Sequence, residues 1–225
     1  MQHSSAGIAI ATLVQFIAPI ASYGAVLLGN YPPVNSFGVP PSFNGQRQKA
    51  ISFTVPAPGY TLDSVVLRLS NFDLETETAL LQVFADPLLT STNPNQATLQ
   101  PVGFETPVAE GPGIDGISID SFTFLPTSSF VFGADTRYWL LVSAANGSEF
   151  EWRADNPPTN VPTGIASFNG WSGSLDGGTT YASSPSSNLL QINATPVPFE
   201  FSPALGLGAL LSALTIFKLG KPKIW

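Results

Sequence analysis

The feature that most constrains the fold is an alternation of apolar and polar side chains that recurs between Ala25 and Thr195. Alternate residues of a strand point to opposite faces of a sheet, whereas an amphipathic helix repeats its apolar positions every three or four residues. In this region no stretch of ten or more residues has the helical period. The sequence therefore predicts an all-β domain.

Nine segments carry strand patterns, and Gly, Pro or Asn residues separate most of them. Segment 137–143 is apolar on both faces, which predicts a central strand covered by a second sheet on one side and a loop on the other. Three intervening stretches, 32–46, 87–116 and 169–188, are expected to be long loops. The predicted strands are 49–55, 64–70, 79–85, 118–124, 129–132, 137–143, 149–154, 165–168 and 189–194.

Eight to ten short strands without helices fit two antiparallel sheets packed face to face. We predict a jelly-roll-like sandwich over residues 25–195, with Trp139 and Trp152 in its core. The Thr-Pro-Val-Pro sequence that follows indicates a short stiff linker at 196–203.

Composition removes several classes of chemistry. The chain has no cysteine and one histidine, His3, which excludes Ser–His and Cys–His nucleophile pairs and metal sites built on cysteine or on two histidines. The net charge is −7, and three of the eight basic residues fall in the last eight positions. The remainder is still more acidic, so nucleic acid is not an expected partner. No cofactor is expected either.

Both ends of the chain predict export. An apolar stretch at 7–21 is followed by small residues, which predicts a signal peptide over 1–24; the alternative is a buried or membrane-anchored N-terminal helix. Near the other end, the 17 residues from Pro203 to Leu219 contain one charge, so residues 204–225 predict a transmembrane helix with a basic tail. Lys218, Lys221 and Lys223 would keep that tail in the cytoplasm. The alternative there is a packed amphipathic helix.

A short motif precedes the apolar tail. A signal, an exported β domain, a proline-bearing motif, an apolar helix and basic terminal residues together resemble the PEP-CTERM proteins of Gram-negative bacteria. The motif replaces the familiar Val-Pro-Glu-Pro with a Pro-Phe-Glu form that resembles a cyanobacterial variant. The resemblance implies processing by an exosortase-type membrane protease at the inner membrane. The motif residues are Pro198, Phe199, Glu200, Phe201, Ser202 and Pro203.

The body of the chain resembles the choice-of-anchor R family, whose members carry several kinds of sorting tail. This resemblance implies an exported sandwich without an assigned activity, and it brings no catalytic or binding residues. Four segments carry it: Lys49-Ala-Ile-Ser-Phe-Thr, Tyr60-Thr-Leu-Asp-Ser-Val-Val-Leu-Arg-Leu-Ser-Asn71, Asp135-Thr-Arg-Tyr-Trp-Leu-Leu-Val142 and Phe150-Glu-Trp-Arg153.

Two groups of acidic residues are candidate sites. Glu149 and Glu151 share one face of a predicted strand, with their α-carbons about 6–7 Å apart. This distance could suit the general acid of a glycosidase and its partner carboxylate. Arg153 follows on that face, so a solvated surface is the simpler interpretation. Asp115 and Asp120 lie in a Gly-rich loop and could chelate Ca²⁺, although their spacing matches no EF-hand.

One aromatic residue is a candidate glycan contact. Trp171 falls in the predicted loop Asn169-Gly-Trp-Ser-Gly-Ser174, where an exposed indole could stack on a sugar ring. The alternative is a ring tucked under the loop as part of a small apolar cluster.

These observations predict a non-enzymatic exported protein. It would be anchored in the inner membrane by its C-terminal helix, and after processing it would reach the cell surface or the extracellular matrix. The alternatives are a module that binds exopolysaccharide, an enzyme that cleaves glycans with Glu149 and Glu151, and a membrane-tethered subunit that is never processed.

Overall fold

The computed structural model describes residues 24–31, 43–112, 119–155 and 160–198. Within these ranges the chain is built from antiparallel strands and one 3₁₀ turn, η1 (Pro94–Gln96). The prediction of an all-β fold is confirmed.

One sheet has seven strands and carries both ends of the described domain. Strand β3 lies at its centre, because it pairs with β15 on one side and with β7 on the other. The strands of this first sheet, in spatial order, are β1 (Ala25–Gly29), β15 (Leu190–Pro196), β3 (Tyr60–Ser70), β7 (Ile119–Phe124) and β6 (Val108–Pro112), with β8 (Val131–Phe132) and β10 (Glu151–Trp152) also paired to β3.

The second sheet has six strands, and a separate two-stranded ribbon lies beside the main sheets. In the second sheet β9 lies between β2 and β4 along its whole length. Its strands, in spatial order, are β13 (Ala182–Ser183), β12 (Ser167–Ser174), β2 (Gln48–Val55), β9 (Thr136–Ala144), β4 (Ala79–Asp86) and β5 (Thr98–Leu99), and the ribbon joins β11 (Ala154–Asp155) to β14 (Ser187–Asn188).

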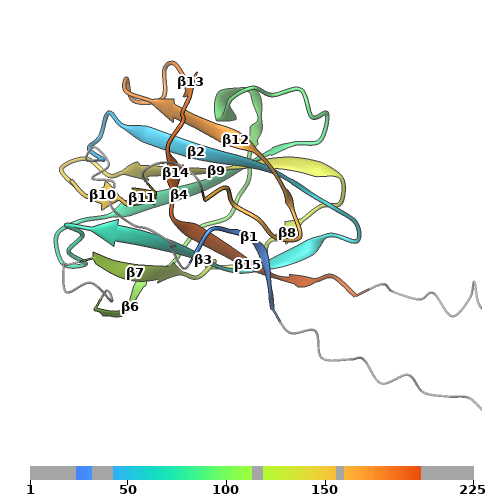
Figure 1. The fold of residues 1–225 in the computed structure, drawn as a ribbon, viewed down its shortest axis with the longest axis horizontal. Helices are drawn as coiled ribbons and strands as arrows, with labels where there is room; N and C mark the ends of the chain where they lie inside the picture. Colours follow the sequence, from blue (N-terminus) through green and yellow to red (C-terminus); the bar gives the residue numbers. More distant parts are fainter. Residues whose placement is uncertain (1–23, 32–42, 113–118, 156–159, 199–225) are drawn as a thin grey trace, which may run out of the picture.

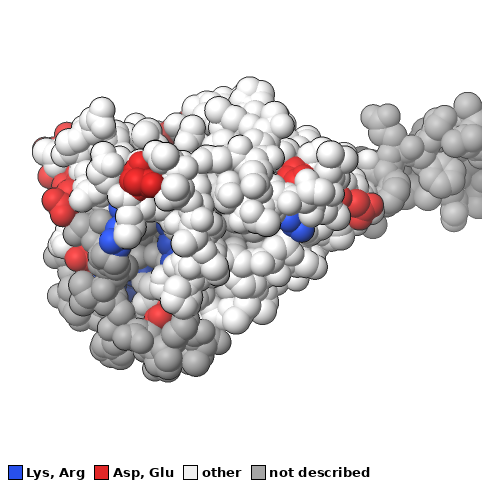
Figure 2. Space-filling view, turned by 90° about the horizontal axis from the view of Figure 1, so that it is seen from above, with Lys and Arg blue, Asp and Glu red and all other residues white. Residues whose placement is uncertain are grey.

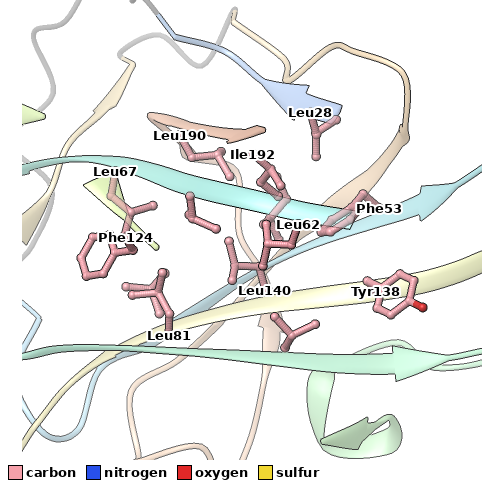
Figure 3. Close-up of a cluster of buried hydrophobic side chains, with 14 of the residues drawn as sticks. Leu28, Phe53, Leu62, Leu67, Leu81, Phe124, Tyr138, Leu140, Leu190 and Ile192 are labelled. Carbon is pink, nitrogen blue, oxygen red and sulfur yellow. The ribbon is translucent and has the colours of Figure 1, made fainter. Parts of the chain in front are cut away.

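The two sheets pack face to face around one hydrophobic core (Figures 1 and 3). The alternating pattern produces this directly, since every second residue of β2 and β3 points inward. Phe53 of β2, Leu67 of β3 and Leu140 of β9 are all at most 1% exposed and belong to the same cluster.

Strand β9 is covered on both faces, as its apolar sequence predicts. Tyr138 and Leu140 point into the core between the sheets. On the outer face, Trp139 and Leu141 form a second small cluster with Ala50 of β2. Side chains from outside the main strands pack against that cluster, among them Ala97 and Tyr181.

The structure corrects several predictions of local structure, among them the expected loop 87–116, which contains η1, β5 and β6. Residues 169–174 belong to β12 rather than to a loop, because backbone bonding to β2 and β13 continues past a bulge at Asn169. These residues are mostly small, so their sequence lacks the apolar–polar alternation by which the other strands were predicted. The predicted strand 149–154 is interrupted at Arg153, between β10 and β11. The strand β1 was not predicted as a strand at all.

Both described ends of the chain leave the sandwich at the same end (Figure 1). Ala25, at the start of β1, pairs with Ala194 near the end of β15, and Pro196 pairs with Tyr60 at the start of β3. Strand β2 runs toward this end and reaches it at Val55. The start of β2, at Gln48, therefore lies at the opposite end of the sandwich.

None of the described segments forms a helix long and apolar enough to cross a membrane. The predicted signal helix at 7–21 and the predicted transmembrane helix at 204–225 lie outside the described residues.

Candidate functional site: the Lys49 groove

Lys49 occupies a core-facing position at the beginning of β2. Its side chain points to the same face of the strand as those of Ile51, Phe53 and Val55, and its cross-strand partner on β9 is the fully buried Val142. Its partner on β12 is Gly173, which has no side chain to fill the space beside it. The lysine is 7% exposed. An amine is thus directed to the edge of the apolar core, where a hydrophobic side chain would be the ordinary choice.

The amine of Lys49 has two kinds of partner. Its Nζ is within hydrogen-bonding distance of both the carbonyl oxygen of Ser186, at 2.7 Å, and the Oγ of the same residue, at 2.5 Å. It also lies 5.0 Å from the centroid of the Trp171 ring. No carboxylate among the described residues forms an ion pair with it.

The surroundings favour the neutral form of this amine. Burial, together with the smaller effect of the nearby positive charge of Arg47, lowers the pKa of Lys49 from 10.5 to about 7. A lysine whose pKa is near 7 is partly neutral at pH 7 and can accept a proton, which a fully protonated surface lysine cannot do.

A groove of about 270 Å³ opens beside Lys49. We call it the Lys49 groove. Its walls are the start of β2, the end of β12 and the segment 182–186. Arg47 and Lys49 are the charged residues among those that line it, and Phe43, Leu175 and Pro185 supply apolar surface. On the face seen in Figure 2, basic atoms gather in a hollow toward one end while most of the surface carries no charge.

Hydroxyl and amide groups hold the wall of the groove in place. Ser184 Oγ lies 3.2 Å from Ser186 Oγ, and the backbone N–H of Ser184 donates to the carbonyl of Trp171. On the other side the phenol of Tyr181 donates to Gln48 Oε1 at 2.5 Å. These bonds fix the segment that carries Ser186 against β12 and β2.

The structure corrects the expected setting of Trp171. Instead of standing exposed in a loop, the residue is 7% exposed on β12, and its ring packs edge-on against Trp152 at 5.6 Å. Lys49 lies over one face of the ring, and the burial of the residue leaves no exposed face on which a sugar could stack. Of the other tryptophans, Trp152 lies in the core between the sheets as predicted, and Trp139 is buried in the second cluster, on the outer face of β9.

The predicted carboxylate pair lies at a different hollow. Glu149 and Glu151 line it together with Glu77, and its volume is about 290 Å³. Glu151 is already engaged, since Ser70 Oγ donates to its Oε2 at 2.8 Å and Arg153 lies 3.7 Å away. Arg153 was expected on a solvated face, but it is 8% exposed, and its backbone lies between β3 and the start of β15, donating to the Arg68 carbonyl and accepting from the N–H of Leu189.

The remaining predicted site residues cannot be placed as side chains. Asp115 lies outside the described residues, and of Asp120 the structure describes only its backbone position in β7. Of the sorting motif, Pro198 is the last described residue, whereas Phe199, Glu200, Phe201, Ser202 and Pro203 lie beyond it, as do Lys218, Lys221 and Lys223. Among the described residues no cluster of three or more acidic or histidine side chains could hold a metal ion.

Comparisons with protein families, with curated proteins and with solved structures gave no match to this chain. The site is therefore interpreted from its own geometry. Sequence reasoning missed it, although one signal was present: Lys49 shares the parity of the core residues of its strand. Ser186 gave no signal, because its place opposite Lys49 depends on a contact across 137 positions of the sequence.

Proposed function

We propose that this chain is an exported protein whose sandwich is displayed away from the membrane. Its C-terminal segment would anchor it in the inner membrane until a protease of the exosortase type cuts near Pro198-Phe199-Glu200. The domain would then reach the cell surface or the extracellular matrix, where its role is to interact with other components.

One structural relationship carries this proposal. The described chain enters the sandwich at Ala25 and leaves it at Pro196, both at one end, and the Lys49 groove lies at the other end, beside the start of β2. Six residue steps of β2 separate Lys49 from Val55, which corresponds to about 20 Å. A domain held through its C-terminal segment would thus present the groove to the outside. The predicted signal and tail, which bracket the domain, support the same orientation.

The strand order supports a jelly roll as the displayed domain. Apart from the consecutive pair β4 and β5, the main strands alternate between the sheets along the chain, with β1-β15-β3-β7 in one sheet facing β2-β9-β4-β5 in the other. Numbered as eight strands, these orders are 1-8-3-6 and 2-7-4-5, which is the arrangement of two interlocked Greek keys. Strand β12 is then an addition at the edge of the second sheet, and it forms one wall of the groove.

A second candidate function is the binding of exopolysaccharide. The specific observation in its favour is the lining of the Lys49 groove, where Ser183 and Ser184 offer hydroxyl groups and Gln48 offers an amide to a polar ligand. In this version the contact residues are those of the groove, and Trp171 acts only as their support.

The test of the display proposal is the intact mass of the protein recovered from inner-membrane, outer-membrane and medium fractions of its native host. We expect a medium or surface form that lacks about the first 24 residues and everything after roughly Pro198. Replacing Phe199 and Glu200 by alanine should leave an unprocessed form in the inner membrane. A wild-type chain that keeps its complete C-terminus in the inner membrane would contradict processing and favour a permanent tether.

A further inference from the structure

The hydroxyl group of Ser186 lies between the open groove and the buried amine of Lys49. Ser186 lines the groove and is partly exposed, whereas Lys49 behind it is 7% exposed. The two side chains meet at 2.5 Å between Nζ and Oγ. A nucleophile within hydrogen-bonding distance of a base, with the nucleophile on the solvent side, is the first requirement for covalent catalysis by a serine.

The base is held in position by groups on its other sides. The carbonyl oxygen of Ser186 accepts a hydrogen bond from Nζ at 2.7 Å, and the Trp171 ring packs against the amine at 5.0 Å. An amine oriented in this way keeps its lone pair available for the one remaining polar neighbour, the Ser186 hydroxyl. Ser184 Oγ, 3.2 Å from Ser186 Oγ, is a further hydrogen-bonding partner for that hydroxyl.

The charges that face Lys49 also leave it able to accept a proton. Arg47, just before the start of β2, lines the groove with it. On the packed elements, the described titratable groups include Tyr181 beside β13, Asp176 in the turn after β12 and Asp155 of β11, which pairs with Ser187; none of the three lines the groove. The pKa of Lys49, lowered to about 7 mainly by burial, means that a large fraction of the amine is neutral at physiological pH.

We propose that Ser186 and Lys49 form a nucleophile–base pair that hydrolyses small carboxylic esters bound in the Lys49 groove. This activity goes beyond the display function, which requires no chemistry. It also needs neither histidine nor cysteine, because serine–lysine pairs perform acyl transfer on other folds. The apolar surface of Phe43, Leu175 and Pro185 suits a short acyl chain, and the volume of about 270 Å³ admits one.

The reaction would proceed in two balanced steps. As Ser186 Oγ attacks the ester carbonyl, its proton passes to neutral Lys49 Nζ; the bond to the alcohol then breaks, and the alcohol leaves with that proton. Water next attacks the acyl-serine while Lys49 takes a proton from it. The acid departs, and the proton returns to Ser186 Oγ.

The groove also offers donors for the negative charge that develops on the carbonyl oxygen. Arg47 contributes a guanidinium group, and Gln48 contributes an amide whose oxygen is already engaged by Tyr181. Donors that are fixed before the reaction stabilise such an oxyanion far better than mobile ones.

The experiment uses the full-length chain purified in detergent. We measure hydrolysis of p-nitrophenyl butyrate between pH 5 and 9, and covalent labelling by a fluorophosphonate probe with the labelled residue located by peptide mass spectrometry. We expect labelling at Ser186 and a hydrolysis rate that rises with pH around a midpoint near 7, as Lys49 loses its proton.

Three variants and a control distinguish catalysis from a structural role. Ser186→Ala should remove the label, and Lys49→Met should lower the rate by about 10²-fold or more, in the range of a lost general base. Lys49→Arg, which keeps a cation but cannot become neutral at these pH values, should be as inactive as Lys49→Met. Ser167→Ala, an exposed serine at the far end of β12, should retain the wild-type rate.

Circular dichroism of each variant reports whether the fold is kept, and Ser186→Ala removes only a hydroxyl group. A folded wild-type chain that neither takes up the probe nor hydrolyses the ester would overturn the proposal. Labelling at another serine, or a rate unchanged in Ser186→Ala, would do the same. None of these outcomes bears on tail processing, which is tested separately in the native host.

Discussion

The Nζ atom of Lys49 lies 5.0 Å from the centroid of the Trp171 ring, and the same ring contacts Trp152 edge-on at 5.6 Å. The amine is thus placed on an aromatic pair that extends into the core, where Trp152 is fully buried. This arrangement explains why Lys49 is desolvated and yet held in a defined position. It also couples the stability of the sandwich to the shape of the groove.

Replacing Trp171 by alanine should therefore destabilise the whole domain. Truncation of a buried tryptophan costs about 3–5 kcal/mol, because the packing is lost and a cavity remains. The indole also shields one side of Lys49, which would become more hydrated. Urea unfolding followed by tryptophan fluorescence measures the change.

The control for this change is Leu175→Ala, which truncates a neighbouring side chain that is 71% exposed. It should alter the free energy of unfolding by no more than about 0.5 kcal/mol. If Trp171→Ala were as mild as Leu175→Ala, the ring would not be the support that the structure shows. Because Trp171→Ala is expected to destabilise the domain, a loss of glycan retention in this variant has to be compared with its loss of stability before it is assigned to a direct contact.

The stability of the protein should depend on pH through Lys49. Its pKa is lowered in the folded state from 10.5 to about 7, so the unfolded chain binds more protons between these values. Stability contributed by the neutral amine is complete above pH 10.5, decreases as the pH falls, and is lost below about pH 7. Each pKa unit corresponds to about 1.4 kcal/mol, which gives a change on the order of 4–5 kcal/mol across the interval.

The variant Lys49→Met isolates this effect, since methionine has no charge to bury. Relative to the wild type, its free energy of unfolding should be most favourable at pH 6–7 and should lose this advantage as the pH approaches 10. Urea unfolding of both proteins at intervals of one pH unit makes the comparison. A difference between them that stays constant over this range would show that Lys49 titrates normally.

The sequence predicted the class of fold better than it predicted the site, for physical reasons. Alternation is a local property, so it located most of the strands, and the doubly apolar segment 137–143 correctly predicted a central strand. Most of strand β12 was not predicted, because Gly170 and Gly173 interrupt any apolar pattern and its pairing depends on backbone hydrogen bonds. The groove was not predicted, because Ser186 and Lys49 come into contact only in the folded sandwich.

A second buried polar cluster holds the loop that covers the outer face of β9. Ser91 donates to Asp86 Oδ2 through both its N–H and its hydroxyl group, each at 2.7 Å. The indole N–H of Trp139 donates to the Ser91 oxygen, and Arg137 donates to the Ser91 carbonyl. These bonds fix the loop after β4 over Trp139.

Replacing Ser91 by alanine should cost about 1–3 kcal/mol, because it leaves the Trp139 N–H and part of the Asp86 carboxylate unpaired. The exposed neighbour Thr90→Ala is the matched control and should be nearly neutral. Thermal unfolding of the two variants gives the difference. Equal melting temperatures would mean that the loop is held by apolar contacts alone.

The same cluster predicts a loss of stability in acid. Burial alone would raise the pKa of Asp86, but the hydrogen bonds from Ser91 and the charge of Arg137 lower it below its ordinary 3.8. Its contribution is therefore present above about pH 4 and is lost as the pH falls further. Urea unfolding between pH 2.5 and 5 should show a steeper loss in the wild type than in Asp86→Asn, and parallel curves would contradict the assignment.

Asn30 should be the most sensitive polar residue at the junction of β1 with β14 and β15. Its amide nitrogen donates to Ser187 Oγ and to the carbonyl of Asn188, at 3.0 and 3.1 Å, while its oxygen accepts from the N–H of Leu190 at 3.0 Å. The residue is 5% exposed. Asn30→Asp keeps the acceptor but loses every donor and adds a buried charge, so we expect a loss of about 3 kcal/mol or more at pH 7. Protonation of the new carboxyl restores one donor and removes the charge, so part of the loss should be recovered near pH 4.

Asn44→Asp is the control, because Asn44 is exposed and uses only its oxygen, which accepts from the N–H of Gln46. Unfolding curves at pH 4 and 7 for both variants decide the matter, and an effect of Asn30→Asp that is the same at the two pH values would show that the buried charge is not its cause.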